Sequence, residues 1–312
     1  MRKALKRGLL VFGVTLLLVL GVLVGLWYQR VKQLADPDFD TSVARPAYPS
    51  QGPRVLFDEA HNNFHTAGGR YKPFVDLITR DGYQVVSNRE RFQSSTLGSF
   101  QVLVIFNAMG AWLPILPGAG NHAFTDQECD AVRDWVREGG SLLLIADHEP
   151  AGAAAQILAR RFDVHMSEGR AFDPSNYVEE VQSLSWILFT RENGLLDDHP
   201  ITQGRDATES INRIIAFTGQ SVKGPKESSA FLKLGDGAYD ILSSGERVPA
   251  AGRAVGIAVQ FGKGRVVVIG EAAMLTAQVV GSARLPLGMN YPGNANRQLA
   301  LNIMHWLTGA LN

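Results

Sequence analysis

Carboxylate, amide and imidazole side chains follow directly after several short apolar runs of this 312-residue sequence. The groups able to take part in chemistry are Asp58, Glu59, His61, Asn62 and His65 after one run, Asn107 after the next, Asp147, His148 and Glu149 after a third, and Glu271 after a late one. In open α/β sheets, ligands bind outside the carboxyl ends of the strands. If the apolar runs are neighbouring parallel strands, these side chains converge on one site.

Two kinds of chemistry fit this set. In the first, zinc or a similar divalent metal is held by imidazole and carboxylate ligands, and a second carboxylate acts as general base on a metal-bound water. The expected metal ligands are His61, His65 and His148, with Asp147 beside them, and the expected bases are Glu59 and Glu149. In the second, no metal takes part, and a carboxylate orients a histidine that moves protons or binds a polar ligand.

We expect the catalytic groups to be Glu59, Asp147, His148 and Glu271, and the ligand-binding groups to be Asp58, Asn62, Asn107, Asn290 and Asn294. Each group also has an ordinary structural interpretation. Asp58 and Asp147 are typical residues for capping a turn or helix, and Glu271 precedes an apolar segment whose N-terminus it would favour. Asn290 and Asn294 lie in a Gly- and Pro-containing loop, where asparagine is common.

Short apolar strands alternate with amphipathic helices, which is typical of an α/β domain with a mainly parallel sheet and helices on both faces. The strands are expected at 55–57, 83–86, 101–107, 141–146, 211–217, 230–234, 254–260 and 265–269, and the helices at 71–80, 125–138, 151–161 and 296–307. Thr125 and Glu128 form a capping-box pattern at the second helix. From 168 to 250 the pattern is irregular and indicates an elaboration of the domain. The whole domain is expected to cover 54–312.

Residues 8–29 form a run of 22 residues without a charge, ending in Trp27 and Tyr28. As a helix this run is about 33 Å long, enough to cross a hydrocarbon core of about 30 Å. Four basic residues precede the run and two follow it, which predicts a cytoplasmic N-terminus (1–7) and a periplasmic or extracellular domain. The bilayer is thus one expected partner, and membrane proteins are others. A linker is expected over 30–53.

The net charge of zero combines two unlike parts. Residues 1–33 contain six basic residues and no acidic ones, which leaves 24 basic against 30 acidic residues in the remainder. A net-acidic domain is a poor partner for nucleic acid, whose phosphates need a basic surface. The single cysteine, Cys129, rules out an internal disulfide, and its place in a predicted helix is typical of a buried core residue.

Two sequence stretches resemble the end of class I glutamine-amidotransferase-like domains, especially membrane-associated members near transport and gliding systems and ThuA-like proteins. They are GRVVVIGE at 264–271 and NANRQLALNIMHWLTG at 294–309. The stretches RVLFDEAHN and GGSLLLIADH are also similar. The resemblance implies a flavodoxin-like fold. It departs from true amidotransferases at the turn after 141–146, where Asp147, His148 and Glu149 stand in place of a nucleophilic cysteine, so we do not expect glutaminase activity.

Two functions follow from the sequence. One is a membrane-anchored extracytoplasmic domain with a polar pocket at the strand ends, acting as a hydrolase that uses a metal in one form of the hypothesis. The other is a non-catalytic module that binds a ligand or a partner within a membrane transport or envelope complex.

Overall fold

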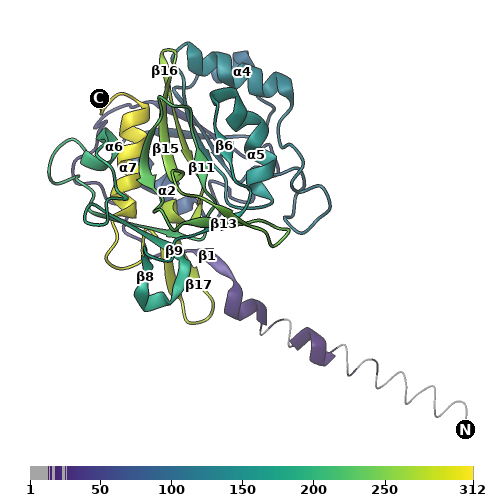
Figure 1. The fold of residues 1–312 in the computed structure, drawn as a ribbon. Coiled ribbons are helices and arrows are strands. Elements are labelled where there is room, and N and C mark those ends of the chain that lie inside the picture. The colour runs from purple at the N-terminus through teal and green to yellow at the C-terminus, as the bar shows by residue number, and fades with distance from the viewer. Residues whose placement is uncertain (1–12, 14, 16–17, 23–24, 26, 312) are drawn as a thin grey trace, which may run out of the picture.

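The computed structural model describes residues 13, 15, 18–22, 25 and 27–311 (Figure 1). Half of the predicted membrane segment at 8–29 therefore lies outside the described residues. Those that are described from 13 to 31 are helical. Within the described part of the chain, no helix is both long and apolar enough to cross a membrane.

The core of the domain is a nine-stranded mixed sheet whose first five strands run parallel. Their order is β3 (Gln84–Asn88), β2 (Arg54–Asp58), β4 (Val102–Phe106), β5 (Ser141–Ile145) and β16 (Gly264–Ile269). Counted along the chain this is the order 2-1-3-4-5, which is that of flavodoxin-like sheets. The antiparallel strands that continue it are β15 (Ala254–Phe261), β11 (Val222–Lys223) and β6 (His165–Met166), with β12 (Ser229–Lys233) also paired to β15. The predicted α/β class with a mainly parallel central sheet is confirmed.

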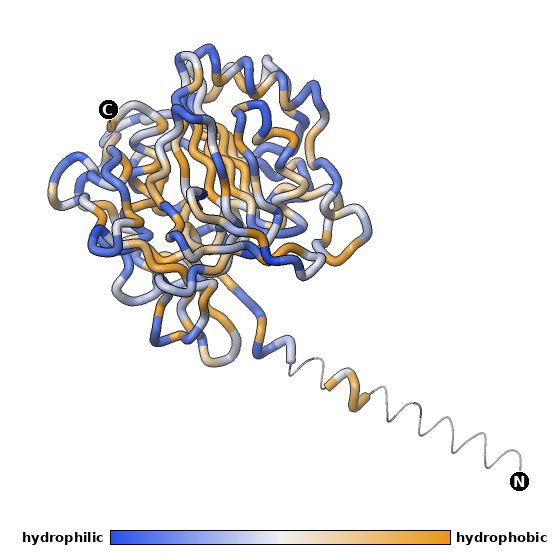
Figure 2. The backbone as a smooth tube through the Cα atoms, in the orientation of Figure 1, coloured by the Kyte–Doolittle hydropathy of each residue, from blue (hydrophilic) through white to orange (hydrophobic). Residues whose placement is uncertain are grey.

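Helices cover both faces of the sheet because successive strand residues point to opposite sides. Val55 and Phe57 pack with α2 (Lys72–Arg80) and α7 (Asn296–Leu307). Leu56, between them, packs in a second core with α4 (Asp126–Arg137) and α5 (Ala151–Ala159), next to the short α3 (Ser94–Leu97). In Figure 2 the central strands are accordingly orange, and blue is concentrated in the surrounding loops and outer helices.

The predicted boundaries of the regular elements agree with the structure to within about two residues. The capping box at α4 is present: Thr125 Oγ1 accepts a hydrogen bond from the Glu128 backbone N–H, and the Glu128 side chain accepts one from Thr125 N. Cys129 is fully buried in the second core, as expected, and burial raises the pKa of its thiol to about 12.

The irregular region at 168–250 forms two small sheets that pack against the α2/α7 face. One consists of β8 (Tyr177–Val178), β9 (Ser183–Thr190) and β10 (Arg213–Phe217), and the other of β7 (Arg170–Phe172), β13 (Tyr239–Ile241) and β14 (Arg247–Pro249). The short helices are α6 (Pro200–Gln203), η1 (Arg160–Phe162), η2 (Glu179–Val181) and η3 (Ala273–Leu275). Ile187, Phe189 and Ile214 are buried in the α2/α7 core. This region is thus part of the domain's packing.

The segment predicted as a linker, 30–53, is attached to the domain. Strand β1 (Gln33–Ala35) pairs with β17 (Ala277–Val280), which continues into β18 (Leu285–Gly288). Farther along, Phe39, Val43 and Tyr48 pack against the α2/α7 core. The sequence pattern did not reveal this because a three-residue edge strand is too short to show alternation.

Asn296, at the start of α7, holds three segments together, and we predict that Asn296→Ala lowers the free energy of unfolding by about 3 kcal/mol. Its amide accepts a hydrogen bond from Ile215 N and donates to Ile215 O and Met274 O, all of them buried. Urea unfolding measures the loss. The exposed Asn121 serves as the matched control, because Asn121→Ala is expected to stay within about 0.5 kcal/mol of the wild type. Equal effects of the two substitutions would contradict the role assigned to Asn296.

Candidate functional site

A cavity of about 410 Å³ lies at the carboxyl ends of β4, β5 and β16. Some of the predicted site residues line this cavity, and others do not. The predicted residues that line it are His65, Asn107, Asp147, His148 and Glu271, together with Glu149. The remaining lining includes Gln33, Phe64, Arg70, Met109, Pro114, Phe217, Thr218, Gln278 and Leu287. A strand-end cavity is where the sheet topology predicts a ligand to bind.

Asp147 is the best-fixed group of the cavity. It follows β5, and its Oδ2 accepts a hydrogen bond of 2.8 Å from Asn107 Nδ2 at the end of β4. Asn107 Oδ1 accepts one of 2.8 Å from the Asp147 backbone N–H, so the two residues are doubly linked. Asn107 has a positive φ of 43°, an uncommon conformation that asparagine tolerates better than most residues. Asn107 therefore positions the carboxylate of Asp147.

Glu271, after β16, is the second carboxylate of the cavity and is 1% exposed. Its two oxygens accept hydrogen bonds of 2.7 Å from Ala273 N and Met274 N, and Asp147 Oδ1 accepts one of 2.6 Å from Ala272 N. Both carboxylates thus bind the backbone at the start of η3. The structural interpretation of Glu271, as a group that favours a helix N-terminus, is consistent with these bonds.

Burial dominates the electrostatics of this pair. Burial, and then the nearby charge of Asp147, raise the pKa of Glu271 from its usual 4.5 to about 8, although the backbone hydrogen bonds act to lower it. Burial also raises the pKa of Asp147, while the hydrogen bonds from Asn107 and Ala272 lower it. Near neutral pH, Glu271 is therefore a protonated carboxylic acid beside Asp147. Two titratable groups in different environments, facing one cavity, are the usual arrangement for acid–base chemistry.

The lining of the cavity also contains a cation and a neutral histidine. Arg70 lies 4.6 Å from the ring centre of Phe64 and donates a 3.2 Å hydrogen bond to Gln33 Oε1. Burial lowers the pKa of Arg70, and the charge of Asp147 opposes that shift. Burial, helped by Arg70, lowers the pKa of His65 to about 3, so His65 is neutral. Its buried Nδ1 has no hydrogen-bond partner among the described residues.

His148 and Glu149 lie between this cavity and a second one of about 510 Å³, and both residues line both cavities. His148 Nδ1 donates a 2.9 Å hydrogen bond to the Glu149 carbonyl oxygen, and Glu149 Oε1 accepts one of 3.1 Å from Ser243. The second cavity is otherwise formed by the irregular region, including Arg170 and Phe172. The irregular region at 168–250 therefore forms part of the surroundings of the predicted site.

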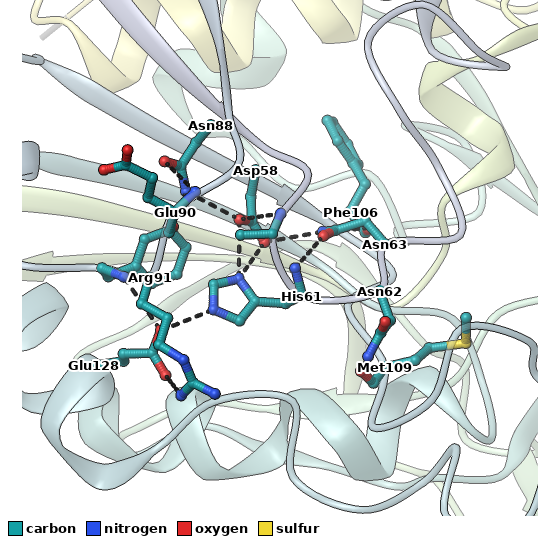
Figure 3. A network of polar contacts seen from close by, with 12 residues as sticks. Asp58, His61, Asn62, Asn63, Asn88, Glu90, Arg91, Phe106, Met109 and Glu128 are labelled. Carbon is teal, nitrogen blue, oxygen red and sulfur yellow. Dashed lines mark hydrogen bonds and ion pairs between the residues drawn. The ribbon is translucent and has the colours of Figure 1, made fainter.

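His61 and Asp58 form a separate buried network (Figure 3). Asp58 Oδ1 and Oδ2 each lie 2.9 Å from His61 Nδ1, and Glu128 Oε1 lies 2.9 Å from His61 Nε2. Asn63 donates to Asp58 Oδ2 at 3.0 Å, and the exposed Arg91 reaches Glu128 Oε2 at 3.3 Å. This is the carboxylate-oriented histidine that the metal-free hypothesis required, but it lines neither of the two cavities. Since both ring nitrogens are occupied, it ties the loop after β2 to α4.

The predicted metal ligands are not brought together. His61 uses both nitrogens within its own network, whereas His65 and His148 line the cavity. Among the described residues, no cluster of three or more His, Cys, Asp or Glu side chains is arranged to hold a metal ion. Histidines that follow strand ends can point in different directions, and a metal site built on these three stays a prediction that this geometry does not favour.

Four other predicted site residues are used by the fold and do not line the cavity. Glu59 Oε1 accepts hydrogen bonds from Ala67 N and Ser87 Oγ, and Asn62 donates to Met109 O. Asn290 donates to Asp36 Oδ2 and Gln278 O, and Asn294 donates to Gly288 O. The turn role anticipated for the two late asparagines describes these contacts.

Several cavity residues were not anticipated from the sequence. Gln33 and Gln278 come from the β1–β17 pair, Phe217 and Thr218 come from the end of β10, and Arg70 precedes α2. Thr218 has a positive φ of 96°, which is uncommon for a threonine. No residue pattern distinguishes these positions, because their place in the cavity depends on the packing of distant segments.

The fold and the cavity together define an α/β domain with a buried carboxylate pair at its strand ends. The N-terminal domain of mmIFT52 has a similar structure, with a TM-score of 0.57 and 13% identity over 81% of this chain and 97% of that one. A cytoplasmic protein from Salmonella typhimurium LT2 gives 0.49 and 15% over 81% and 99%, and a ThuA-like protein from Parabacteroides merdae ATCC 43184 gives 0.44 and 14% over 83% and 91%.

At these identities the likeness concerns the fold alone, and only the first of these scores is high enough to support it. No protein-family model matches the sequence. No curated protein matches it either.

The His61 network predicts a pH-dependent contribution to stability. Burial alone would lower the pKa of His61, but the hydrogen bonds and charges of Asp58 and Glu128 raise it above its usual 6.5. Burial would raise the pKa of Glu128, but hydrogen bonds from Thr125 and His61 lower it to about 2. The His61 contribution is therefore complete below pH 6.5 and is lost as pH rises through the higher folded pKa. The Glu128 contribution is complete above pH 4.5 and is lost only as pH falls toward about 2.

We expect His61→Gln to lower the free energy of unfolding more at about pH 5.5 than at about pH 8.5, because only the protonated ring pairs with both carboxylates. Urea unfolding at the two pH values measures the difference. His122→Gln, at an exposed position, is the matched control and should show no such pH dependence. An equal loss at both pH values for His61→Gln would show that the ring is neutral in the folded protein.

Proposed function

We propose that the cavity at the ends of β4, β5 and β16 binds a small uncharged polar molecule, and that Glu271 donates a proton to it. The observation that carries this proposal is the buried pair of Asp147 and Glu271, with the pKa of Glu271 raised to about 8. A carboxylic acid with a pKa near the working pH is suited to general acid catalysis. Asp147 lies beside Glu271, and in its ionised form it can accept a proton or stabilise positive charge that develops in the transition state.

The charge distribution of the lining favours an uncharged ligand. An anion would face Asp147 and Glu149, and a cation would face Arg70. Phe64, Phe217 and Met109 supply apolar surface, which is typical of small-molecule sites with a few fixed polar groups. Hydroxyl or amide groups of a ligand can pair with Arg70, which lines the cavity. Hydrolysis of such a molecule by acid–base chemistry is the reaction class we propose.

We further propose that the domain is of the class I glutamine-amidotransferase-like type without the nucleophile of that family. The turn after β5 reads Asp147, His148, Glu149 and Pro150 and contains no cysteine or serine. Cys129 is buried in the core, and its thiol has a pKa of about 12. A covalent thioester mechanism has no group to use here, which supports direct acid–base chemistry.

A second candidate function is a non-catalytic binding module. The observation in its favour is that both carboxylates accept backbone hydrogen bonds from the start of η3, a structural task that any folded form of the domain needs. In that case the cavity binds its ligand without turning it over.

We predict that the wild-type protein shows the infrared absorption of a protonated carboxyl group at neutral pH, and that this band disappears as the pH rises through about 8. Glu271→Gln should lack the band because the carboxyl group whose pKa is raised to about 8 is gone. Glu138→Gln, at an exposed position, should retain it. Presence of the band in Glu271→Gln, or its absence in the wild type, would contradict the role of Glu271 as an acid.

A panel of neutral monosaccharides, polyols and amino-acid amides, together with their nitrophenyl glycosides and anilides, tests the function itself. Binding raises the melting temperature by mass action, and turnover releases the chromophore. We expect Glu271→Gln to bind the same compounds as the wild type but to lose turnover. Binding by both proteins without any turnover would favour the non-catalytic module, and preference for charged compounds would contradict the proposed ligand class.

We also propose that residues 8–29 anchor the chain in a membrane, with the domain outside the cytoplasm. The support is the uncharged run of 22 residues with a basic excess before it. The full chain should stay with membranes after alkaline carbonate extraction. Leu18→Arg combined with Val22→Arg should release it, because each central arginine costs about 2.5–3.5 kcal/mol on insertion. Recovery of the uncleaved wild-type chain in the supernatant would contradict the anchor.

A further inference from the structure

The end of the N-terminal helix is fixed directly to the domain. The helix continues to Val31, only Lys32 follows, and β1 begins at Gln33. Lys32 O accepts a 2.8 Å hydrogen bond from Gly281 N in the turn between β17 and β18. Gly281 has a φ of 65°, and a Cβ there would lie 2.3 Å from Arg30 O, so this turn packs closely on the helix end. Figure 1 shows the helix leaving the domain at β1, on the side of β17.

The same place is one side of the cavity opening. Gln33, two residues after the helix, lines the cavity and accepts the hydrogen bond from Arg70. Tyr28 lies within the last turns of the same helix. Four residues lie between Tyr28 and Gln33, so the two are five backbone steps apart. Since an extended residue spans at most about 3.6 Å, the rim at β1 stays within about 18 Å of the aromatic end of the apolar run.

The other side of the opening carries exposed apolar side chains. Pro114 lines the cavity, and its neighbours in the loop after β4 are Trp112, 69% exposed, and Ile115, 86% exposed. Phe64, which also lines the cavity, is 41% exposed. Large apolar groups concentrated at the mouth of a site, with tryptophan among them, are typical of surfaces that contact a membrane interface.

The charges at the β1 side are mixed. Arg30 and Lys32 lie at the helix end, and residues 1–33 contain no acidic side chain. Asp36 and Asp38 follow β1, and both pair with Arg284 of the β17–β18 turn. The apolar side chains and the short distance to the apolar run, and not the charge, therefore point to a membrane surface.

From this arrangement we infer that the cavity opens onto the bilayer. Trp112 and Ile115 lie in the bilayer interface beside the helix, and the cavity takes its uncharged polar ligand from molecules held at the membrane surface, such as the sugar headgroups of uncharged glycolipids. This inference rests on the proposed anchor and deepens the proposed function. The occupant of the apolar rim is the phospholipid bilayer into which residues 8–29 insert.

A depth-sensitive fluorophore tests the inference in the full chain reconstituted into nanodiscs of phosphatidylglycerol and phosphatidylcholine. Ile115→Cys is labelled with a nitrobenzoxadiazole maleimide, and lipids with a spin label near the headgroup act as quenchers. Cys129 is buried with a thiol pKa of about 12, so the unsubstituted chain serves as a labelling blank. Lys263→Cys is the matched control, because Lys263 lies in the turn before β16, at the opposite end of the sheet from the cavity.

We expect the probe at position 115 to lose most of its emission and the probe at position 263 to lose none. Trp112→Cys provides a second labelled position and should give the same loss. Equal emission at 115, 112 and 263 in chains recovered with nanodiscs would overturn the inference and leave the anchor and the cavity chemistry standing. Failure of the full chain to enter nanodiscs would overturn both the anchor and this inference, while the infrared test of Glu271 is independent of either result.

Discussion

The hydrogen bonds of Asp147 are the interaction on which the site depends. Asp147 follows β5. Its Oδ2 accepts a hydrogen bond from Asn107 at the end of β4, and its Oδ1 accepts one from the Ala272 N–H after β16. One carboxylate therefore joins the ends of three parallel strands. The same bonds bring Glu271 close enough for the charge of Asp147 to raise its pKa. A buried carboxylate charge at this point would be costly without these hydrogen-bond donors. The same hydrogen bonds therefore fix the geometry of the strand ends and influence the pKa values of the two carboxyl groups.

The predicted site residues of the loop after β2 have two different roles in the structure. The loop after β2 carries His61 to one side, where Asp58 and Glu128 tie it to α4, and carries His65 to the other side, into the cavity. The loop is thus fixed at one end by an ionisable network while its other end forms part of the ligand wall. Asn107, in contrast, belongs to the site because it orients Asp147.

The fold was largely predictable, and the site only in part. Continuous apolar runs such as SLLLI and capping signals such as Thr125 with Glu128 are local, and local patterns are what a sequence displays. Asn107, Asp147 and Glu271 were found because they end strands of the parallel sheet, whose position follows from topology. Gln33, Arg70 and Thr218 were missed because only tertiary packing brings them to the cavity. The sequence also could not show that His61 lies apart from His65 and His148, because side-chain direction at a strand end is set by the loop and its hydrogen bonds.

The single residue between the N-terminal helix and β1 has a mechanical consequence. A flexible linker would let the domain turn freely about the end of the helix. Here Lys32 is held by the β17–β18 turn, and Gln33 accepts a hydrogen bond from Arg70 in the cavity wall. The end of the helix and the rim of the cavity are therefore joined by hydrogen bonds, with no flexible segment between them.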